Sequence, residues 1–462
     1  MTEETREISF DALAKGMVSR TISRRQAFKW LGGVALLGGG LASIPGVARA
    51  AQGDNKEGQA VNTGFDKTLA DTWTSRTLAH AHYGGADFGE CATTSERVTE
   101  GDADSWYQEW NATADRVYAI GEESEGKGHK VSAREAYLRA SNYYRTSYVP
   151  LYGAPVDSRL VEAFDKETDA FQRAAALFDP PVEPVEIPYE DTTLPGYFYR
   201  VDDSGEQRPT LIGGSGYDST IQESHFAHAV AAVSRGYNCL NFDGPGQARA
   251  LFKEDLHMRP DWENVVTPVV DYALSRPEVD PERVALSGPS FGGYLVPRAA
   301  SGEHRLAAII ADPGQWDMLE AVKGVVSKSG VSQEVVDSLP DVDPEALVPF
   351  FEAVDKSPQL TWAIKQRDLL VHGVDSIMDF LRLTPEYSLS DRVDEIRCPT
   401  LVTSAESDPI AGFADKLYEA LSSPKTLVRF TNDEGAGEHV EMNGRRLFHQ
   451  RAYDWLDETL EV

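Results

Sequence analysis

Residues 283–293 read RVALSGPSFGG, and this stretch determines how the rest of the chain is interpreted. Its apolar residues 284–286 predict a short buried strand, and residues 294–300 predict a helix. A G-x-S-x-G turn lies between them, which strains the backbone at Ser290 and would expose its hydroxyl. The order of strand, sharp turn and helix therefore predicts that Ser290 is a nucleophile.

The residues around Ser290 suit that geometry. Gly288 and Gly292 are the small residues expected two positions either side of such a serine, and Gly293 would let the helix pack close. The backbone N–H of Phe291 would lie at the helix N-terminus, where it can face a developing oxyanion. The pattern also fits a plain glycine-rich turn in a parallel sheet, so the rest of the chain has to decide between the two.

Composition narrows the possible partners. The chain has 462 residues, 41% of them hydrophobic, which is enough for one large domain and a smaller one. Its formal net charge is −30; residues 1–50 carry a net +3, so the remainder carries −33. Such an acidic surface argues against nucleic acid and anionic membranes as partners.

The three cysteines, Cys91, Cys239 and Cys398, are scattered along the chain. They show neither a C-x-x-C motif nor a metal-ligand spacing, so we expect no disulfide framework, no metal and no organic cofactor. Cys239 lies in a predicted strand and is expected to be a buried thiol.

The N-terminus resembles a twin-arginine export signal. Residues 23–29 read SRRQAFK, residues 30–47 are apolar but rich in glycine, and residues 48–50 form an A-x-A cleavage site. The apolar run is too short and too glycine-rich to predict a membrane span, although an uncleaved anchor is the alternative. We expect residues 1–50 to be a signal read by the twin-arginine export machinery, residues 51–64 to be a flexible linker, and the mature protein to have no stable span.

Residues 65–181 predict a helical cap domain. Residues 103–120, 132–148 and 158–178 have the spacing of amphipathic helices, and the Asp-Pro-Pro sequence at 179–181 stops the last one. Aromatic residues are dense here and predict either the lining of a substrate pocket or, for most of them, an ordinary helical core: Trp73, Tyr83, Phe88, Trp106, Tyr107, Trp110, Tyr137, Tyr143, Tyr144, Tyr148 and Tyr152.

Residues 182–462 alternate between predicted strands and helices, which indicates an α/β fold with a mostly parallel sheet covered on both faces. We expect about eight strands, with the Ser290 turn after the fifth, at residues 185–189, 196–201, 210–213, 238–242, 284–287, 307–310, 400–404 and 426–431. Helices are expected at residues 225–234, 262–275, 413–421 and 445–460. The alternation lapses over residues 312–397, a helix-like segment interrupted by prolines, which predicts either a lid that completes the pocket wall or a structural insertion.

A serine nucleophile needs a base within hydrogen-bond reach, and the base needs an acid that orients it. His439 lies in a glycine-rich loop after the last predicted strand and is the expected base. His449 lies inside the C-terminal helix and is expected to pack or to face solvent. Asp408 follows the preceding strand and is the expected acid, although Glu406 also qualifies by position.

Two further glycine-rich turns could shape the site. Residues 213–218 follow the third predicted strand, and the Tyr217 N–H is the expected second oxyanion donor beside Phe291. Residues 243–247 follow the fourth strand and form either the floor of the pocket or a plain β-to-α turn.

With the serine turn, the acid and the histidine in this order, residues 185–462 resemble the α/β-hydrolase superfamily. The helical region, the sequence FDGPGQ at 242–247 and the sequence EGAGEH at 434–439 look like the group that contains 2,6-dihydroxypseudooxynicotine hydrolase and a fungal pigment heptaketide hydrolase. This resemblance covers residues 65–462. It implies Ser290, Asp408 and His439 as the triad, an N-terminal helical cap and, in some members, cleavage of carbon–carbon bonds in β-dicarbonyl-like aromatic ketones.

We therefore expect an exported serine hydrolase that acts on an ester or ketone carbonyl of an aromatic or apolar small molecule. The alternatives are an acyltransferase that uses the same residues, a non-catalytic binding protein on the same fold, and a prolyl-oligopeptidase-like exopeptidase. No propeller repeats precede residue 182, which argues against the exopeptidase. The oligomeric state does not follow from the sequence.

Overall fold

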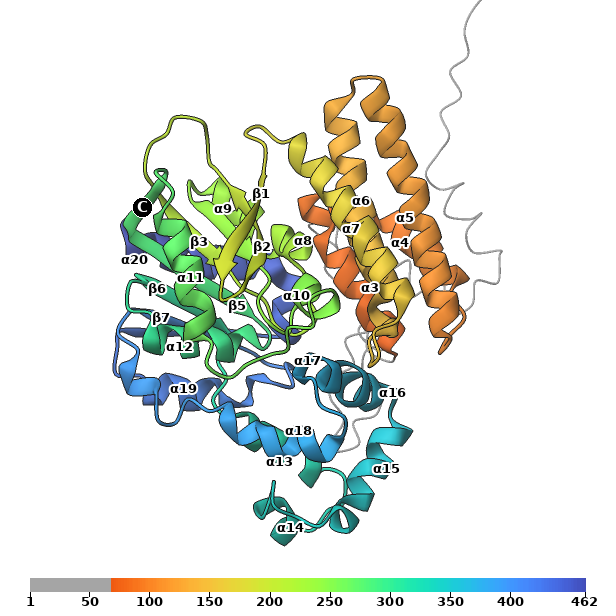
Figure 1. Ribbon diagram of the computed structural model, residues 1–462, viewed down its shortest axis with the longest axis vertical. Coiled ribbons are helices and arrows are strands. Elements are labelled where there is room, and N and C mark those ends of the chain that lie inside the picture. The colour runs from red at the N-terminus through yellow and green to blue at the C-terminus, as the bar shows by residue number, and fades with distance from the viewer. Residues whose placement is uncertain (1–67) are drawn as a thin grey trace, which may run out of the picture. The chain divides into compact units, whose positions relative to one another are not determined.

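A computed structural model describes residues 68–462 of the chain (Figure 1). The expected export signal (1–50) and linker (51–64) lie outside the described residues. Within the described part, a helical region is followed by an eight-stranded sheet with helices around it. Across residues 68–462, no helix combines the length and the apolar character that crossing a membrane requires.

Within the described residues, five α-helices precede the sheet, and they are coloured orange to yellow in Figure 1. Four of them begin at an Asp or Thr side chain that accepts a backbone N–H of the first turn, which satisfies a donor that has no partner within the helix. This confirms the predicted helical character of the region. The helices are α3 (Leu69–Ala79), α4 (Phe88–Arg97), α5 (Ala103–Gly126), α6 (Lys130–Tyr148) and α7 (Ser158–Ala176).

Most aromatic residues of these helices pack against one another. The ring of Trp106 lies 5.3 Å from that of Trp73 and 5.6 Å from that of Trp110, measured between centroids, and all three rings are buried. Trp362, from the segment between β6 and β7, joins the same cluster at 5.5 Å from Trp73. The helical-core interpretation is therefore confirmed for these tryptophans, and the pocket-lining interpretation is wrong for them.

The sheet has the strand order β1-β2-β4-β3-β5-β6-β7-β8. β2 is antiparallel to β1 and β4, and the other neighbours are parallel, which confirms the predicted α/β fold. The strands are β1 (Glu183–Tyr189), β2 (Thr192–Tyr199), β3 (Arg208–Gly213), β4 (Asn238–Phe242), β5 (Val279–Pro289), β6 (Ala308–Asp312), β7 (Thr400–Ala405) and β8 (Lys425–Phe430). β5 starts earlier than predicted because Val279 pairs with Arg208 before a register shift, a pairing that the polar residues 280–283 conceal in the sequence.

Successive side chains of the parallel strands enter two different apolar cores, as the two-residue period of a strand requires. Leu211, Cys239, Ala285, Ile310 and Leu401 pack in one core, and Ile212, Leu240, Leu286, Ile309 and Val402 pack in the other. Helices cover both faces: α9 (Val230–Ser234) and α20 (Arg445–Leu460) on the first, and α11 (Glu263–Leu274), α12 (Gly292–Gly302) and α19 (Ala414–Ala420) on the second. Burial of Cys239 in this sheet confirms its prediction as a buried thiol.

Short helices fill the segment between β6 and β7, and we call this segment (residues 313–399) the insertion. It has an apolar core of its own that includes Val326, Phe350 and Leu381. The helices are α13 (Met318–Ser327), α14 (Gln333–Asp337), α15 (Val348–Lys356), α16 (Pro358–Leu360), the π-helical η5 (Thr361–Asp368), α17 (Leu369–His372) and α18 (Ile377–Leu383).

A buried ionic cluster joins the first helices to the sheet. Arg76 of α3 donates to the Glu223 carboxylate of α8 (Ile221–Ser224) and, at 2.8 Å, to Asp218. Arg145 of α6 is 2% exposed, donates to the Asp218 carbonyl at 2.8 Å and lies 3.5 Å from Glu223. Arg367 of the insertion lies 3.6 Å from the Asp218 carboxylate. Charges from three parts of the chain therefore meet at Asp218 and Glu223.

Glu223 should contribute most of its stabilisation above pH 4.5. Burial acts to raise the pKa of the Glu223 carboxyl, but Arg145 and Arg76 outweigh it and hold that pKa well below 4.5. We expect Glu223→Gln to lower the free energy of unfolding by about 3 kcal/mol at neutral pH, because the buried guanidinium of Arg145 and the half-buried one of Arg76 lose a partner. Because the folded-state pKa is depressed, this difference should shrink as the pH falls below 4.5.

Urea unfolding followed by circular dichroism at pH 7 and at decreasing pH would measure both effects. Glu352→Gln is the matched control, because Glu352 is 60% exposed in its pair with Lys356 and should contribute less than about 1 kcal/mol. Equal stabilities of the two variants at pH 7 would show that the cluster at Glu223 does not stabilise the fold.

Candidate active site

Ser290 lies in the sharp turn between β5 and α12. Its φ is +62°, in the left-handed region that residues other than glycine seldom adopt. A Cβ at position 288 would lie 2.7 Å from Val296 Cγ2, and a Cβ at position 293 would lie 1.7 Å from the Pro313 carbonyl oxygen, so both positions need glycine. The requirement is looser at Gly292, where a Cβ would meet its nearest atom at 3.4 Å.

Ser290, His439 and Asp408 form a continuous hydrogen-bonded series. His439 Nε2 lies 3.1 Å from Ser290 Oγ, and His439 Nδ1 lies 2.9 Å from each carboxylate oxygen of Asp408. The structure does not bring Glu406 to this histidine; the Glu406 carboxylate accepts the Asn432 backbone N–H at 2.8 Å instead. His449 is buried between Tyr83 and the Ala227 carbonyl, which is the packing role expected for it.

Asp408 and His439 stabilise each other's charged form. Burial acts to raise the pKa of Asp408, but His439 and the backbone N–H groups of Ile410 and Val440 outweigh it and lower that pKa. Burial acts to lower the pKa of His439, but the Asp408 carboxylate outweighs it and raises that pKa above 6.5. The imidazole is therefore a stronger base than a free histidine, and an imidazolium formed there would be stabilised.

The two residues after His439 have strained backbones. Val440 and Glu441 have φ of +51° and +49°, values that are rare for residues with a Cβ and especially for a β-branched one. The Val440 N–H donates to Asp408 at 3.1 Å, and its carbonyl accepts from Arg445 at 2.9 Å. These bonds fix the turn that presents His439 to Ser290.

A buried acid pair lies behind this turn. Burial and the neighbouring Asp312 raise the pKa of Glu441 well above 4.5, which favours its protonated form. Asp312 also pairs with Arg445 at 2.6 Å and accepts the Thr403 hydroxyl at 2.9 Å. The carboxyl end of β6 and the histidine turn are thereby connected through one guanidinium group.

Residues 213–218, which we call the glycine loop, run directly beside the serine. A Cβ at Gly216 would lie 2.8 Å from Ser290 Cβ, 3.0 Å from Ser290 Oγ and 2.9 Å from the Phe291 backbone nitrogen. Only a glycine leaves the loop backbone this close to the nucleophile. Gly216, the residue before Tyr217, thus lies beside both the Ser290 hydroxyl and the Phe291 backbone nitrogen.

Gln247 fixes the glycine loop from behind, a role that we did not predict from the sequence. Its Nε2 donates to the Ser215 and Gly216 carbonyls at 2.8 and 3.0 Å, and its Oε1 accepts the Gly244 N–H at 2.8 Å. The turn 243–247 joins β4 to α10 (Ala248–Phe252), as its β-to-α interpretation predicts, and it also supports the glycine loop. The sequence did mark this residue, because Gln247 ends the FDGPGQ stretch that contributes to the family resemblance.

Aromatic rings stack on one another at the serine turn. The Tyr217 ring stacks on Phe291 at 4.5 Å between centroids, and Phe291 in turn lies 5.3 Å from Tyr294. These rings come from the glycine loop and the start of α12. The sequence predicted aromatic pocket residues in the N-terminal helices, whereas these rings belong to the sheet domain.

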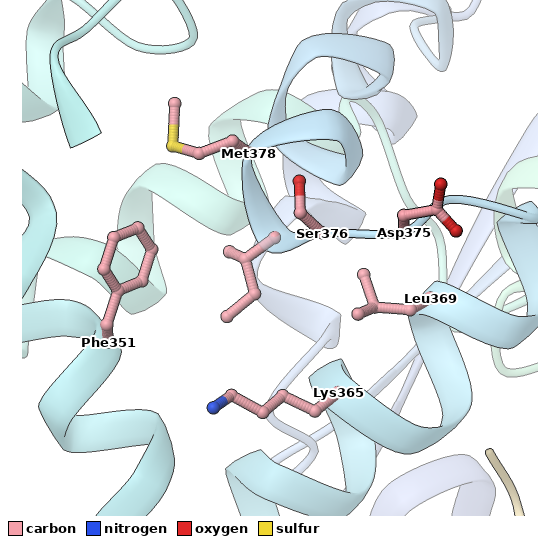
Figure 2. Close-up of a pocket in the computed structure, with 7 residues that line it drawn as sticks. Phe351, Lys365, Leu369, Asp375, Ser376 and Met378 are labelled. Atoms are coloured by element: carbon pink, nitrogen blue, oxygen red, sulfur yellow. The ribbon is translucent and has the colours of Figure 1, made fainter. Parts of the chain in front are cut away.

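An open pocket of about 460 Å³ lies in the insertion (Figure 2). The side chains of Phe351, Lys365, Leu369 and Met378 surround it in Figure 2, and none of its lining residues is Ser290, Asp408 or His439. Among residues 68–462, no group of three or more His, Cys, Asp and Glu side chains is arranged to hold a metal ion.

Comparison with known proteins extends this description. The sequence profile of the X-Pro dipeptidyl-peptidase (S15) family matches residues 191–440. Hydrolase LUC6 of Fusarium sp is 33% identical over 421 residues, which cover 86% of this chain and 98% of the relative. The 20-hydroxy-prefusarin hydrolase FUS2 of Gibberella moniliformis is 33% identical over 404 residues, which cover 84% of this chain and 95% of that protein.

Solved structures show the same fold. The crystal structure of 2,6-dihydroxy-pseudo-oxynicotine hydrolase superposes with a TM-score of 0.66 at 23% identity, covering 83% of this chain and 95% of that one. This similarity includes the helical region as well as the sheet, because it extends over most of both chains. On its sequence relatives and its eight-stranded sheet, the chain belongs to the α/β-hydrolase superfamily, and it is a hydrolase close to these fungal enzymes.

Proposed function

We propose that this hydrolase is a serine enzyme that cleaves an ester or a ketone carbon–carbon bond of an aromatic or apolar small molecule. The observation that carries the proposal is the Asp408–His439–Ser290 series, with distances of 2.9 and 3.1 Å, at a serine whose φ is +62°. A nucleophile, a base and an orienting acid in contact are the geometric signature of nucleophilic catalysis.

In this mechanism His439 Nε2 takes the Ser290 proton as Ser290 Oγ attacks the substrate carbonyl carbon. The backbone N–H groups of Phe291 and Tyr217 stabilise the oxyanion of the tetrahedral intermediate. His439 then gives the proton to the leaving oxygen or carbon, and an acyl group stays on Ser290. Water, deprotonated by His439, hydrolyses this acyl-enzyme.

The relatives and the rings around Ser290 support the substrate class. The relatives are named for hydrolysis of 20-hydroxy-prefusarin and of 2,6-dihydroxy-pseudo-oxynicotine rather than of peptides. The buried rings of Tyr217 and Phe291 make the surroundings of the serine turn apolar. We propose cleavage of an aryl ester or aryl ketone carbonyl on these grounds.

An exopeptidase is the second candidate, because the matching S15 profile is that of the X-Pro dipeptidyl-peptidases. Helices, rather than a propeller, occupy residues 69–176 ahead of the sheet, which favours the small-molecule hydrolase. Turnover of aryl esters and 1,3-diketones but not of X-Pro amides would support our assignment. Release of amino-acid amides without ester cleavage would reverse it.

Export is a separate proposal that rests on residues 23–50 of the sequence. The paired arginines, the apolar run and the A-x-A site fit a twin-arginine signal. Fractionation of cells that express the full chain, with Arg24→Lys/Arg25→Lys as the comparison, would test whether the pair directs export.

Fluorophosphonate labelling tests the nucleophile. We expect the reagent to modify Ser290, because His439 makes its hydroxyl reactive. The labelled peptide is identified by mass spectrometry, and Ser290→Ala should abolish the label. The control is Ser407→Ala, which should leave the label in place because Ser407 bonds to Asn432 rather than to His439. Modification of a different residue, retained in Ser290→Ala, would contradict the proposal.

Gly216→Ala tests the contact between the glycine loop and Ser290. Its added methyl group would lie 2.8 Å from Ser290 Cβ, so the serine or the loop must move. We expect kcat/KM for the aryl ester to fall about 100-fold, the loss typical of misplacing a reacting group by about 1 Å. Gly214→Ala is the matched control, since its Cβ would meet nothing closer than 3.7 Å. Similar rates in the two variants, at unchanged melting temperature, would exclude this requirement.

Asp408→Asn tests the acid. Because the Asp408 carboxylate raises the pKa of His439 above 6.5, kcat/KM of the wild-type enzyme should rise with pH through a midpoint above 6.5. The variant should lower kcat by about 10⁴-fold and shift that midpoint to lower pH. Glu406→Gln should change neither kcat nor the midpoint, because Glu406 bonds to Asn432. An intact rate in Asp408→Ala would rule out Asp408 as the acid.

A further inference from the structure

The Tyr217 side chain contacts both the sheet domain and the insertion. Its ring stacks on Phe291 at 4.5 Å, and the Arg367 guanidinium lies over the same ring at 5.2 Å from the centroid. Its hydroxyl lies 2.8 Å from His372 Nε2. Phe291 belongs to the sheet domain, whereas Arg367 and His372 come from the insertion, 150 and 155 residues further along the chain than Tyr217.

The hydrogen bonds around His372 have a single consistent direction. The Tyr387 hydroxyl donates to the Met258 carbonyl at 3.0 Å, so its oxygen accepts from His372 Nδ1 at 3.1 Å. With the proton on Nδ1, Nε2 is left to accept from the Tyr217 hydroxyl. Every donor in this series has one acceptor, and the last acceptor is a backbone carbonyl of the sheet domain.

His372 stays neutral in this position. It is 7% exposed, and burial together with Arg367 and His257 lowers its pKa to about 3. Its neighbours are otherwise the uncharged hydroxyls of Tyr217 and Tyr387 and the ring of Phe380. The histidine therefore does not titrate over the pH range of an assay and acts through its two hydrogen bonds alone.

We propose that His372 is a positioning residue, which fixes the Tyr217 backbone N–H toward the oxyanion by holding the Tyr217 side chain. The inference rests on the proposed function, because it assumes an oxyanion at Ser290. The contacts support it in two steps: Gly216 lies against Ser290, and Tyr217, the next residue, is anchored to the insertion by its ring and its hydroxyl. Correct placement of the insertion thereby becomes a condition for stabilising the transition state.

His372→Leu removes both hydrogen bonds and fills similar space, and Tyr217→Phe removes only the hydroxyl that His372 accepts. The probe is a fluorophosphonate, whose phosphoryl oxygen develops charge in the oxyanion site as Ser290 attacks. We expect the maximal labelling rate to fall about 10- to 100-fold in either variant, with the half-saturating concentration changed less than about threefold. Because both changes act through one hydrogen bond, the double variant should be no slower than His372→Leu alone.

His372→Gln is the rescue variant, since an amide offers one acceptor and one donor in place of Nε2 and Nδ1. It should recover most of the lost rate, whereas a purely space-filling role would leave Leu and Gln alike. Circular dichroism and melting temperature verify that each variant folds.

The outcomes separate the two proposals. Wild-type protein that does not label at Ser290 overturns the serine mechanism and, with it, this inference. Wild-type protein that labels, together with His372→Leu that labels equally fast, overturns the inference and leaves the mechanism standing. Additive losses in the double variant would show that His372 does not act through Tyr217.

Discussion

The contact between Gly216 and Ser290 is the constraint on which the site depends. The loop backbone approaches so closely that a Cβ would lie 2.8 Å from the serine Cβ, so the path of the chain leaving β3 is fixed at this point. The next two residues contact different parts of the chain. The Tyr217 ring meets the insertion, and the Asp218 carboxylate meets Arg76 of the N-terminal helices. The sheet, the first helices and the insertion are connected through three consecutive residues.

Strain accumulates at both ends of the Ser290–His439 hydrogen bond. Ser290, Val440 and Glu441 all have positive φ, a conformation that costs on the order of 1–3 kcal/mol per residue. Local bonds offset this on the histidine side, where Asp408 accepts the Val440 N–H and Arg445 donates to its carbonyl. On the serine side, the Gln315 amide donates to the Ser290 carbonyl. The strained geometry persists because surrounding groups from other segments complete its hydrogen bonds.

The fold and the residues Ser290, Asp408 and His439 could be predicted because a short stretch of sequence indicates each of them. A strand, a glycine-flanked serine and a helix occur within a few residues, and Asp408 and His439 each directly follow a predicted strand. His372, Arg76 and Gln247 could not be found in this way, since the partners that decide their roles, Tyr217, Asp218 and Gly216, lie 155, 142 and 31 residues away in the sequence. The sequence favours Asp408 as the acid but leaves Glu406 open, and the contact of Asp408 with His439 distinguishes the two. The sequence left open whether the tryptophans of the first helices form a core or a pocket wall, since aromatic composition does not distinguish the two. In the structure they form a core.

The first helices and the sheet share one apolar core, in which Tyr148, Tyr152 and Phe164 pack with Phe252, the last residue of α10 (Ala248–Phe252). Each buried ring contributes roughly 1.5–3 kcal/mol that would be lost to water if the two parts separated. A hinge that swings these helices away as one body would therefore be energetically prohibitive on every turnover. The insertion is held in the same way where Leu370, Val371 and Phe380 join the shared core. Only its part around Val326 and Phe350, which packs in a separate core, can move without opening the shared one.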